Sequence, residues 1–279
     1  MSTIAEWRDL FARLVVANVG VSRGSDVEAA FRSTPREDYL GPGPWKLFTA
    51  GGYVETPSAD PRFIYQDVTV ALVPERSINN GQPTLHALCL SMLAIRAGES
   101  VLHVGAGTGY YTAILAALVG SEGSVTAYEV EADLAKRAEA SFADQRNVTI
   151  FGHSGSAAPL PIADVIYVNA GATEPLDVWL DALGPGGRLL FPLTPATGVG
   201  GMLLVSRSSD DAAFAARFIS RAMFIPCVGA RSEDTATKLT DAFRRTDWAE
   251  VRSLRRGGIP DETSWVAGST WWLSKQQSQ

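Results

Sequence analysis

The sequence predicts an α/β protein with a Rossmann-like, mostly parallel, doubly wound sheet, preceded by a helical N-terminal extension and followed by a C-terminal elaboration. Three observations support this fold class. After residue 100, short apolar runs alternate with helix-like segments, the first run ends in a glycine-rich loop, and polar residues directly follow later strands. Successive strand–helix units form a parallel sheet that is covered on both faces, and such sheets bind ligands beyond the carboxyl ends of their strands.

The first hundred residues predict helices with a strand-like insertion. Apolar side chains recur at helical spacing over residues 4–17, and Asp26 is the expected N-cap of a helix over residues 26–33. Clustered glycines and prolines predict an ordered loop over residues 41–61. The β-forming residues from Phe63 to Pro74 favour a strand or a hairpin arm.

The next helix is expected to begin near Pro83, because the first turn of a helix tolerates proline, and to end at Gly98. Strands and helices then alternate. The strands are expected over residues 101–104, 125–128, 148–151, 165–168 and 188–191. The helices between them are expected to run through Leu115 to Gly120, over residues 131–142, and from Thr173 to Gly184. Beyond Gly201 the pattern predicts strands over residues 202–205, 213–219 and 271–273 and a helix over residues 233–244.

These elements divide the chain into an N-terminal extension that carries the substrate loop (residues 1–98), a ligand-binding core (residues 99–230) and a C-terminal elaboration (residues 231–279). No linker or repeat separates them, so we expect one continuous domain.

Composition excludes several classes of protein. Of the 279 residues, 46% are hydrophobic, 9% are aromatic and 19% are charged, which is too apolar for a disordered chain. No apolar run is long enough to span a membrane, and the N-terminus lacks a signal-peptide pattern, so we expect a cytoplasmic protein. The net charge of −6 argues against nucleic acid as a partner. Cys89 and Cys227 fit buried structural thiols, and the three histidines lack metal-ligand spacing, so no metal is expected.

The most informative segment is the loop that contains Gly105, Gly107 and Gly109. A glycine loop between a strand and a helix offers backbone N–H groups and the positive end of the helix dipole to a ligand. Its Gly-x-Gly-x-Gly spacing differs from the Gly-x-Gly-x-x-Gly of dinucleotide enzymes, and no Walker lysine follows. Glu129 ends the next strand, twenty residues after Gly109, where a carboxylate can accept ribose hydroxyls. Asn169 follows a later strand, at the expected ligand edge of the sheet.

These residues resemble the protein-L-isoaspartate O-methyltransferase family, within the class I fold of S-adenosylmethionine-dependent methyltransferases. The resemblance covers residues 77–228, about half of the chain. Residues 101–113 are similar to the family's first cofactor motif and residues 164–170 to its fourth-strand motif. The turn at residues 183–192 and the segment at residues 224–229 resemble two later motifs of the family.

The resemblance implies S-adenosylmethionine as cofactor and assigns roles to several residues. Glu129 would hold the ribose hydroxyls, and Val130 would flank the adenine. Ser154 stands where the family has an aspartate near the adenine amine, and His103 stands where it has an acidic residue. The candidate cofactor-binding residues are Gln82, His86, His103, Gly105, Ala106, Gly107, Gly109, Tyr110, Glu129, Val130, Ser154 and Asn169.

The substrate loop departs from the family. The family carries Thr-Ile-Ser-x-Pro before a helix, whereas one alignment of this chain places Gly81 at the serine position and another places Asn79 there, with two residues inserted. Neither supplies a hydroxyl. Asn79 and Asn80 are the candidate catalytic residues, and these two or Gln82 would contact the methyl acceptor. We therefore expect weak or absent activity on isoaspartyl peptides.

The predicted function is O-methylation of a protein or peptide carboxylate. A carboxylate is ionised at neutral pH and needs no general base, whereas an amine or phenol acceptor would need a base such as His86, His103 or His153. Two alternatives stay open: a methyltransferase for a small metabolite, and a cofactor-binding module that has lost catalysis. The sequence does not give the oligomeric state.

Overall fold

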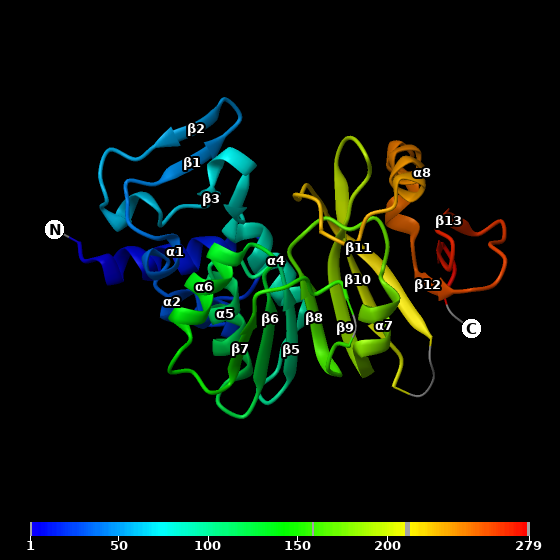
Figure 1. The fold of residues 1–279 in the computed structure, drawn as a ribbon, viewed down its shortest axis with the longest axis horizontal. Helices are drawn as coiled ribbons and strands as arrows, with labels where there is room; N and C mark the ends of the chain where they lie inside the picture. Colours follow the sequence, from blue (N-terminus) through cyan, green and yellow to red (C-terminus); the bar gives the residue numbers. More distant parts are fainter. Residues whose placement is uncertain (1, 158, 210–212, 278–279) are drawn as a thin grey trace. The chain divides into compact units, whose positions relative to one another are not determined.

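The computed structural model describes residues 2–157, 159–209 and 213–277. The chain, drawn in Figure 1, divides into two compact units. The first unit comprises Met1–Gly98 and Ala106–His153, and the second comprises Glu99–Gly105 and Ser154–Gln279. Among the described residues, no helix is both long and apolar enough to cross a membrane.

The first unit begins with helices that match the predicted ranges. Helix α1 spans Ile4–Ala17 and starts with a capping box, in which the Thr3 hydroxyl accepts the N–H of Glu6 and the Glu6 carboxylate accepts the N–H of Thr3. Helix α2 spans Asp26–Ser33 and packs against α1. The prediction of Asp26 as its N-cap is wrong by one residue, because the Ser25 hydroxyl accepts the N–H of Glu28. A short helix α3, Glu37–Leu40, follows.

The predicted loop over residues 41–61 contains a β-hairpin instead. Strands β1 (Lys46–Thr49) and β2 (Gly52–Glu55) are antiparallel, and Gly52 adopts a φ of +105° at their turn. Two of the glycines that predict a loop, Gly51 and Gly52, are therefore hairpin-turn residues. Strands β3 (Val70–Val73) and β4 (Ile78–Asn80) complete a sheet in the order β2-β1-β3-β4. The predicted strand from Phe63 is shorter than expected, because a 3-10 helix occupies Pro61–Phe63.

The rest of the first unit follows the predicted alternation. Helix α4 spans Pro83–Leu93 with Pro83 in its first turn, but it ends at Ala94 in a left-handed conformation rather than at Gly98. Helix α5 (Tyr110–Val119) ends at Gly120 as predicted. Strands β6 (Ser124–Tyr128) and β7 (Val148–Phe151) are parallel, and α6 (Ala132–Ser141) connects them. Helix α5 packs against β6, and α6 packs against β7.

The second unit is built on one twisted sheet. Strands β5 (Ser100–Val104), β8 (Ala163–Val168) and β9 (Leu183–Leu193) are parallel. Antiparallel strands extend β9 in the order β10-β11-β12-β14-β13. They span Gly200–Arg207, Phe214–Ala222, Ser253–Arg256, Trp271–Ser274 and Ser264–Ala267. The parallel strands confirm the Rossmann-like core, and β12 and β13 were not predicted.

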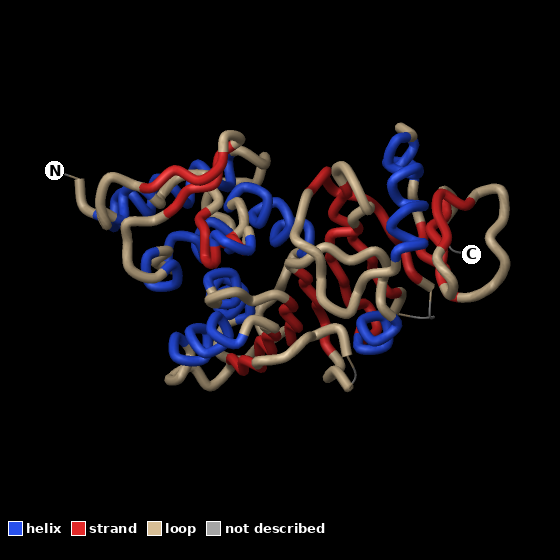
Figure 2. The backbone as a smooth tube through the Cα atoms, turned by 45° about the horizontal axis from the view of Figure 1, so that its top comes forward, coloured by secondary structure: helices blue, strands red, loops and turns tan. Residues whose placement is uncertain are grey.

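Helices cover parts of this sheet. Helix α8 (Glu233–Arg244) matches its predicted range and lies beside β13 (Figure 2). Helix α7 spans only Asp177–Ala182 and packs on β9. Its predicted start at Thr173 is wrong because the backbone of residues 171–173 bonds to neighbouring segments, with the N–H of Thr173 donating to Ala230 O. A 3-10 helix at Asp247–Glu250 precedes β12.

Candidate functional site

The glycine loop of the first unit is confined by its neighbours. Gly107 and Gly109 have φ values of +59° and +95°, which favour glycine. A Cβ at Gly109 would lie 2.6 Å from the Phe142 ring, and one at Gly107 would lie 3.2 Å from Leu72 Cδ1. The N–H of Ala106 donates to Tyr128 O at 3.1 Å. The loop therefore brings its backbone close to the end of β6, as a ligand-binding glycine loop requires.

Glu129, the predicted ribose ligand, is tied to that loop. Its Oε2 accepts the N–H of Gly107 at 2.6 Å, and its Oε1 accepts the N–H of Glu131 at 2.9 Å. The residue is only 6% exposed, and this burial raises the pKa of its carboxyl. Each carboxylate oxygen can still accept a further hydrogen bond. Val130, the predicted adenine neighbour, is 44% exposed beside it.

The groups of the loop fit a ligand that carries hydroxyls. The Thr108 hydroxyl is buried and has no hydrogen-bond partner among the described residues, and Glu129 adds an acceptor pair. Tyr110 begins α5, but its side chain is fully buried and contacts the rings of Phe31, Tyr39 and Tyr111. The side chain of Tyr110 therefore packs in the interior, and only its backbone borders the loop.

The predicted acceptor segment, residues 77–86, follows residues that contact the glycine loop and the end of β6 in the same unit. Leu72 of β3 lies against Gly107, as described above. Arg76, which directly precedes the segment, forms an ion pair with Glu131, with Nη2 2.6 Å from Oε1. These contacts join β3 and β4 to both the loop and the strand end that carries Glu129. The sequence did not single out Leu72 or Arg76, because their partners are distant along the chain.

Asn79 and Asn80 lie on opposite faces of β4. Asn80 is 6% exposed, and its Oδ1 accepts a hydrogen bond from Nη2 of the buried Arg36 at 3.2 Å. Asn79 is half-buried, and its Oδ1 accepts the hydroxyl hydrogen of Tyr53 at 2.7 Å. Neighbouring residues of a strand alternate between faces, so the structure does not bring these two side chains together. Only Asn79 is accessible to an acceptor.

Gln82 and His86 are engaged in local structure. Gln82 Nε2 donates to Asp67 Oδ2 at 2.9 Å, while Asp67 Oδ1 accepts the N–H of Thr84 in the first turn of α4. His86 is buried and stacks on Tyr111, with 3.5 Å between ring centroids. A Cβ at Gly81 would lie 2.1 Å from His86 Nε2, so position 81 has no room for a serine side chain. A serine at position 81 would therefore require His86 to move.

The predicted site residues of the second unit centre on Asn169, which follows β8. His103 Nε2 lies 2.7 Å from Asn169 Nδ2, and complete burial lowers the pKa of His103 to about 3. The neutral imidazole therefore accepts the amide hydrogen. Asn169 Oδ1 is buried with no hydrogen-bond partner in the described part of the chain, and Gly105 lies against the Asn169 backbone. The Ser154 hydroxyl contacts Ser156 Oγ at 2.7 Å and Val228 O at 3.1 Å.

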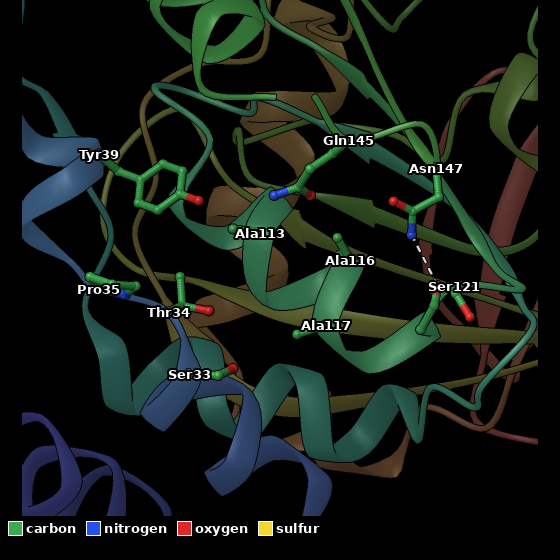
Figure 3. Close-up of a pocket in the computed structure, with 11 residues that line it drawn as sticks. Ser33, Thr34, Pro35, Tyr39, Ala113, Ala116, Ala117, Ser121, Gln145 and Asn147 are labelled. Carbon is green, nitrogen blue, oxygen red and sulfur yellow. Dashed lines mark hydrogen bonds between the residues drawn. The ribbon is translucent and has the colours of Figure 1, made fainter. Parts of the chain in front are cut away.

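A separate pocket of about 500 Å³ lies in the first unit (Figure 3). Ala113, Ala116 and Ala117 of α5 form one wall. The polar side chains of Thr34 and Asn147 are bonded to backbone carbonyls of the same unit. None of the predicted site residues lines this pocket, so we assign it no role in the reaction.

Comparison with known proteins decides the family. Residues 8–232 match the family description "Protein-L-isoaspartate(D-aspartate) O-methyltransferase (PCMT)". The chain belongs to this family. It is therefore an S-adenosylmethionine-dependent methyltransferase, and the resemblance seen in its motifs is confirmed. The match ends at residue 232, directly before α8.

Protein-L-isoaspartate O-methyltransferases from several organisms are similar to the chain. The Rhodopseudomonas palustris (strain BisB5) enzyme is 34% identical over 149 residues, which cover 53% of this chain and 67% of that protein. The Brucella anthropi enzyme is 32% identical over 169 residues, which cover 60% of this chain and 76% of that protein. The Arabidopsis thaliana enzyme 1 is 31% identical over 189 residues, covering 63% and 73%.

Solved structures confirm the fold. A protein-L-isoaspartate O-methyltransferase superimposes with a TM-score of 0.66 at 22% identity, covering 92% of this chain and 74% of that one. A Plasmodium falciparum protein of the same class, in complex with S-adenosyl-L-homocysteine, superimposes with a TM-score of 0.62 at 18% identity. The match covers 80% of this chain and 98% of that one. At these identities the likeness concerns the fold alone.

Proposed function

We propose that this methyltransferase methylates a carboxylate of a protein or peptide that binds beside Asn79. The main support is one set of contacts in the first unit: Glu129 is bonded to the glycine loop, and the loop contacts the sheet that carries Asn79. Leu72 thereby links the strand end that could hold a ribose with the sheet that could hold an acceptor.

The chain's own residues would bind and orient the reactants. When bound, S-adenosylmethionine supplies an electrophilic methyl group, whose transfer to a carboxylate oxygen breaks the carbon–sulfur bond and leaves a methyl ester and S-adenosylhomocysteine. Glu129 would accept the ribose hydroxyls, and Val130 would flank the adenine. We keep His103, Ser154 and Asn169 as proposed contacts of the cofactor on the basis of the family resemblance. Asn169 Oδ1, which has no hydrogen-bond partner among the described residues, is a suitable acceptor for an ammonium group.

The proposed acceptor needs orientation rather than a base. A carboxylic acid of ordinary pKa, about 4, is ionised at neutral pH, so its oxygen is already nucleophilic. Asn79 Nδ2 donates one hydrogen to Ser77 O at 2.9 Å, and its second hydrogen can bind the acceptor carboxylate. Placing the acceptor oxygen in line with the methyl group is then the main contribution of the protein.

The proposal is tested by methyl transfer from labelled S-adenosylmethionine. The acceptors are an isoaspartyl peptide, its aspartyl isomer and a lysate of the host cell. We expect base-labile label that is released as methanol, because esters hydrolyse in base and methylamines do not. Turnover of the isoaspartyl peptide should be slow, since the acceptor segment offers an amide in place of a hydroxyl. Base-stable label, or no transfer to any acceptor despite cofactor binding, would overturn the proposal.

A further inference from the structure

The β2-β1-β3-β4 sheet has two distinct faces. Its inner face carries Leu47, Val70 and Leu72, which pack with the buried Leu40 and Trp45. The other face carries Phe48 and Tyr53, which are register partners on β1 and β2. It also carries Asn79, whose register partner on β3 is Ala71. We call Phe48, Tyr53, Ala71 and Asn79 the outer face.

A tyrosine reaches across this outer face. Tyr53 lies on the edge strand β2, and β1 and β3 separate it from β4, yet its hydroxyl lies 2.7 Å from Asn79 Oδ1. Ala71 is the register partner of Asn79 on β3, and its small side chain leaves the outer face open beside Asn79. The Phe48 ring packs against the edge of the Tyr53 ring, with 5.4 Å between centroids. Packing against Phe48 therefore holds the Tyr53 ring, and the Tyr53 hydroxyl donates to Asn79 Oδ1.

The two hydrogen bonds of Asn79 fix which end of its carboxamide faces outward. Oδ1 accepts from Tyr53, and Nδ2 donates to Ser77 O. Rotation of the amide by 180° would place the oxygen against the Ser77 carbonyl and lose that bond, and Tyr53 would then have to accept from Nδ2 instead of donating to Oδ1. Within the described part of the chain, Ser77 O is the only acceptor that Nδ2 has, so its second hydrogen is available to an anion.

We propose that Tyr53 is a positioning residue for the methyl acceptor, because its hydroxyl holds the Asn79 carboxamide with the N–H group toward the acceptor carboxylate. This inference rests on the proposed carboxyl methylation and adds a specificity determinant to it. The hairpin Lys46–Glu55 becomes part of the acceptor site, and its exposed Phe48 provides an apolar surface beside the carboxylate. The ligand class is a peptide with a carboxylate side chain next to an apolar residue.

The test compares Tyr53→Phe, Asn79→Ala and the double variant with wild type. Tyr53→Phe removes one hydroxyl and keeps the ring contact with Phe48. The matched control is Tyr39→Phe, which removes a tyrosine hydroxyl in the same unit, away from the outer face. The acceptor is whichever isomer, isoaspartyl or aspartyl, of one peptide wild type methylates faster. KM for the peptide, kcat and the Kd of S-adenosylmethionine are measured for each protein.

We expect Tyr53→Phe to raise KM about three- to tenfold, the usual value of one hydrogen bond, with kcat and cofactor Kd within about twofold of wild type. The double variant should be no worse than Asn79→Ala, since Tyr53 acts through Asn79. Asn79→Asp should raise KM more than Asn79→Ala, because a carboxylate repels the acceptor. The Tyr39→Phe control should match wild type.

Three results would contradict the inference. An unchanged KM in Tyr53→Phe, with active wild type, would remove Tyr53 from the site and leave the proposed function standing. Additive losses in the double variant would show that the tyrosine acts independently of Asn79. If neither isomer is methylated, binding of the fluorescent peptides in the presence of S-adenosylhomocysteine is compared instead, and equal affinity of wild type and Tyr53→Phe would refute the positioning role. Absence of transfer to any acceptor, lysate included, would refute the proposed function itself.

Discussion

Replacing Glu129 is the most direct test of the cofactor site. In Glu129→Ala the pair of acceptors for the ribose hydroxyls disappears. Hydrogen bonds to a charged group contribute about 1.5–3 kcal/mol, so we expect the Kd of S-adenosylmethionine to rise about ten- to a hundredfold. The substitution also leaves the N–H groups of Gly107 and Glu131 without their acceptor, and a buried unsatisfied donor costs about 1–3 kcal/mol.

Glutamine is not a conservative replacement at this position. Both carboxylate oxygens face a backbone donor, with Gly107 N at 2.6 Å and Glu131 N at 2.9 Å. An amide must place its NH₂ group against one of the two N–H groups, which is a donor–donor contact. Glu129→Gln should therefore weaken cofactor binding at least tenfold. Glu139→Gln on the exposed side of α6 is the matched control and should bind as wild type does.

The pH dependence of binding adds a second readout. Burial raises the pKa of Glu129, so its carboxyl takes up a proton at a higher pH than an exposed glutamate does. The protonated group loses acceptor capacity, and the affinity of wild type for the cofactor should fall as the pH falls through that raised pKa. Without cofactor, the free energy of unfolding depends on pH in the opposite direction. The reason is that the folded state holds the proton of Glu129 more tightly than the unfolded state does. The contribution of Glu129 to stability declines as the pH rises from the unfolded pKa through the folded pKa.

Isothermal titration calorimetry with S-adenosylmethionine and S-adenosylhomocysteine measures the affinities, and circular dichroism establishes that each variant is folded. Folded Glu129→Ala that binds the cofactor as tightly as wild type would refute the assignment. A Glu129→Gln variant with the same pH dependence of affinity as wild type would show that another group is responsible for the titration.

Three further predictions concern stability and are measured by urea denaturation. Gly81→Ser should destabilise the fold by about 1–3 kcal/mol through overpacking against His86, and adding His86→Ala should relieve that clash; a fully stable single variant would contradict the packing. Burial lowers the pKa of His103 to about 3, so between about pH 6.5 and pH 3 only the unfolded chain takes up its proton. The free energy of unfolding should therefore fall by up to about 1.4 kcal/mol for each pH unit in this range. His103→Asn should reduce this slope between pH 7 and pH 5. Arg188 Nη1 and Nη2 lie 2.9 and 2.7 Å from the two carboxylate oxygens of the mostly buried Glu99. Arg188→Ala removes this bidentate partner and should lower the free energy of unfolding by about 2–4 kcal/mol. A decrease below about 0.5 kcal/mol would show that the pair contributes no more than an ordinary surface ion pair.

The sequence by itself determined the α/β core and the position of the glycine loop, to which Glu129 is bonded. After residue 100, short apolar runs typical of strands alternate with helix-like segments, and each segment can be recognised from a few neighbouring residues. The glycines at positions 107 and 109 and the carboxylate at position 129 were predictable because a tight loop and a strand end are encoded by neighbouring residues. The family resemblance followed from these motifs and was confirmed.

The hairpin and the strand register on which the proposed acceptor site depends were decided only by the tertiary structure. The hairpin of β1 and β2 was interpreted as a loop, because its glycines fit either structure and its partner β3 lies more than a dozen residues later. Strands β12 and β13 were missed because β12 contains a single apolar residue, Leu254, and both strands are defined by pairing with β14.

The sequence could not distinguish Asn79 from Asn80. Pairing with Ala71 turns Asn79 to the outer face, and pairing with Val70 turns Asn80 toward Arg36. The role of Tyr53 was equally hidden, because its hydroxyl meets a residue 26 positions away across two strands. Strand register depends on contacts between segments that are remote in sequence, and a shift of one residue exchanges the two faces. Local pattern therefore determined where the glycine loop lies, whereas strand register determined that Asn80 is buried and that Asn79 lies on the outer face.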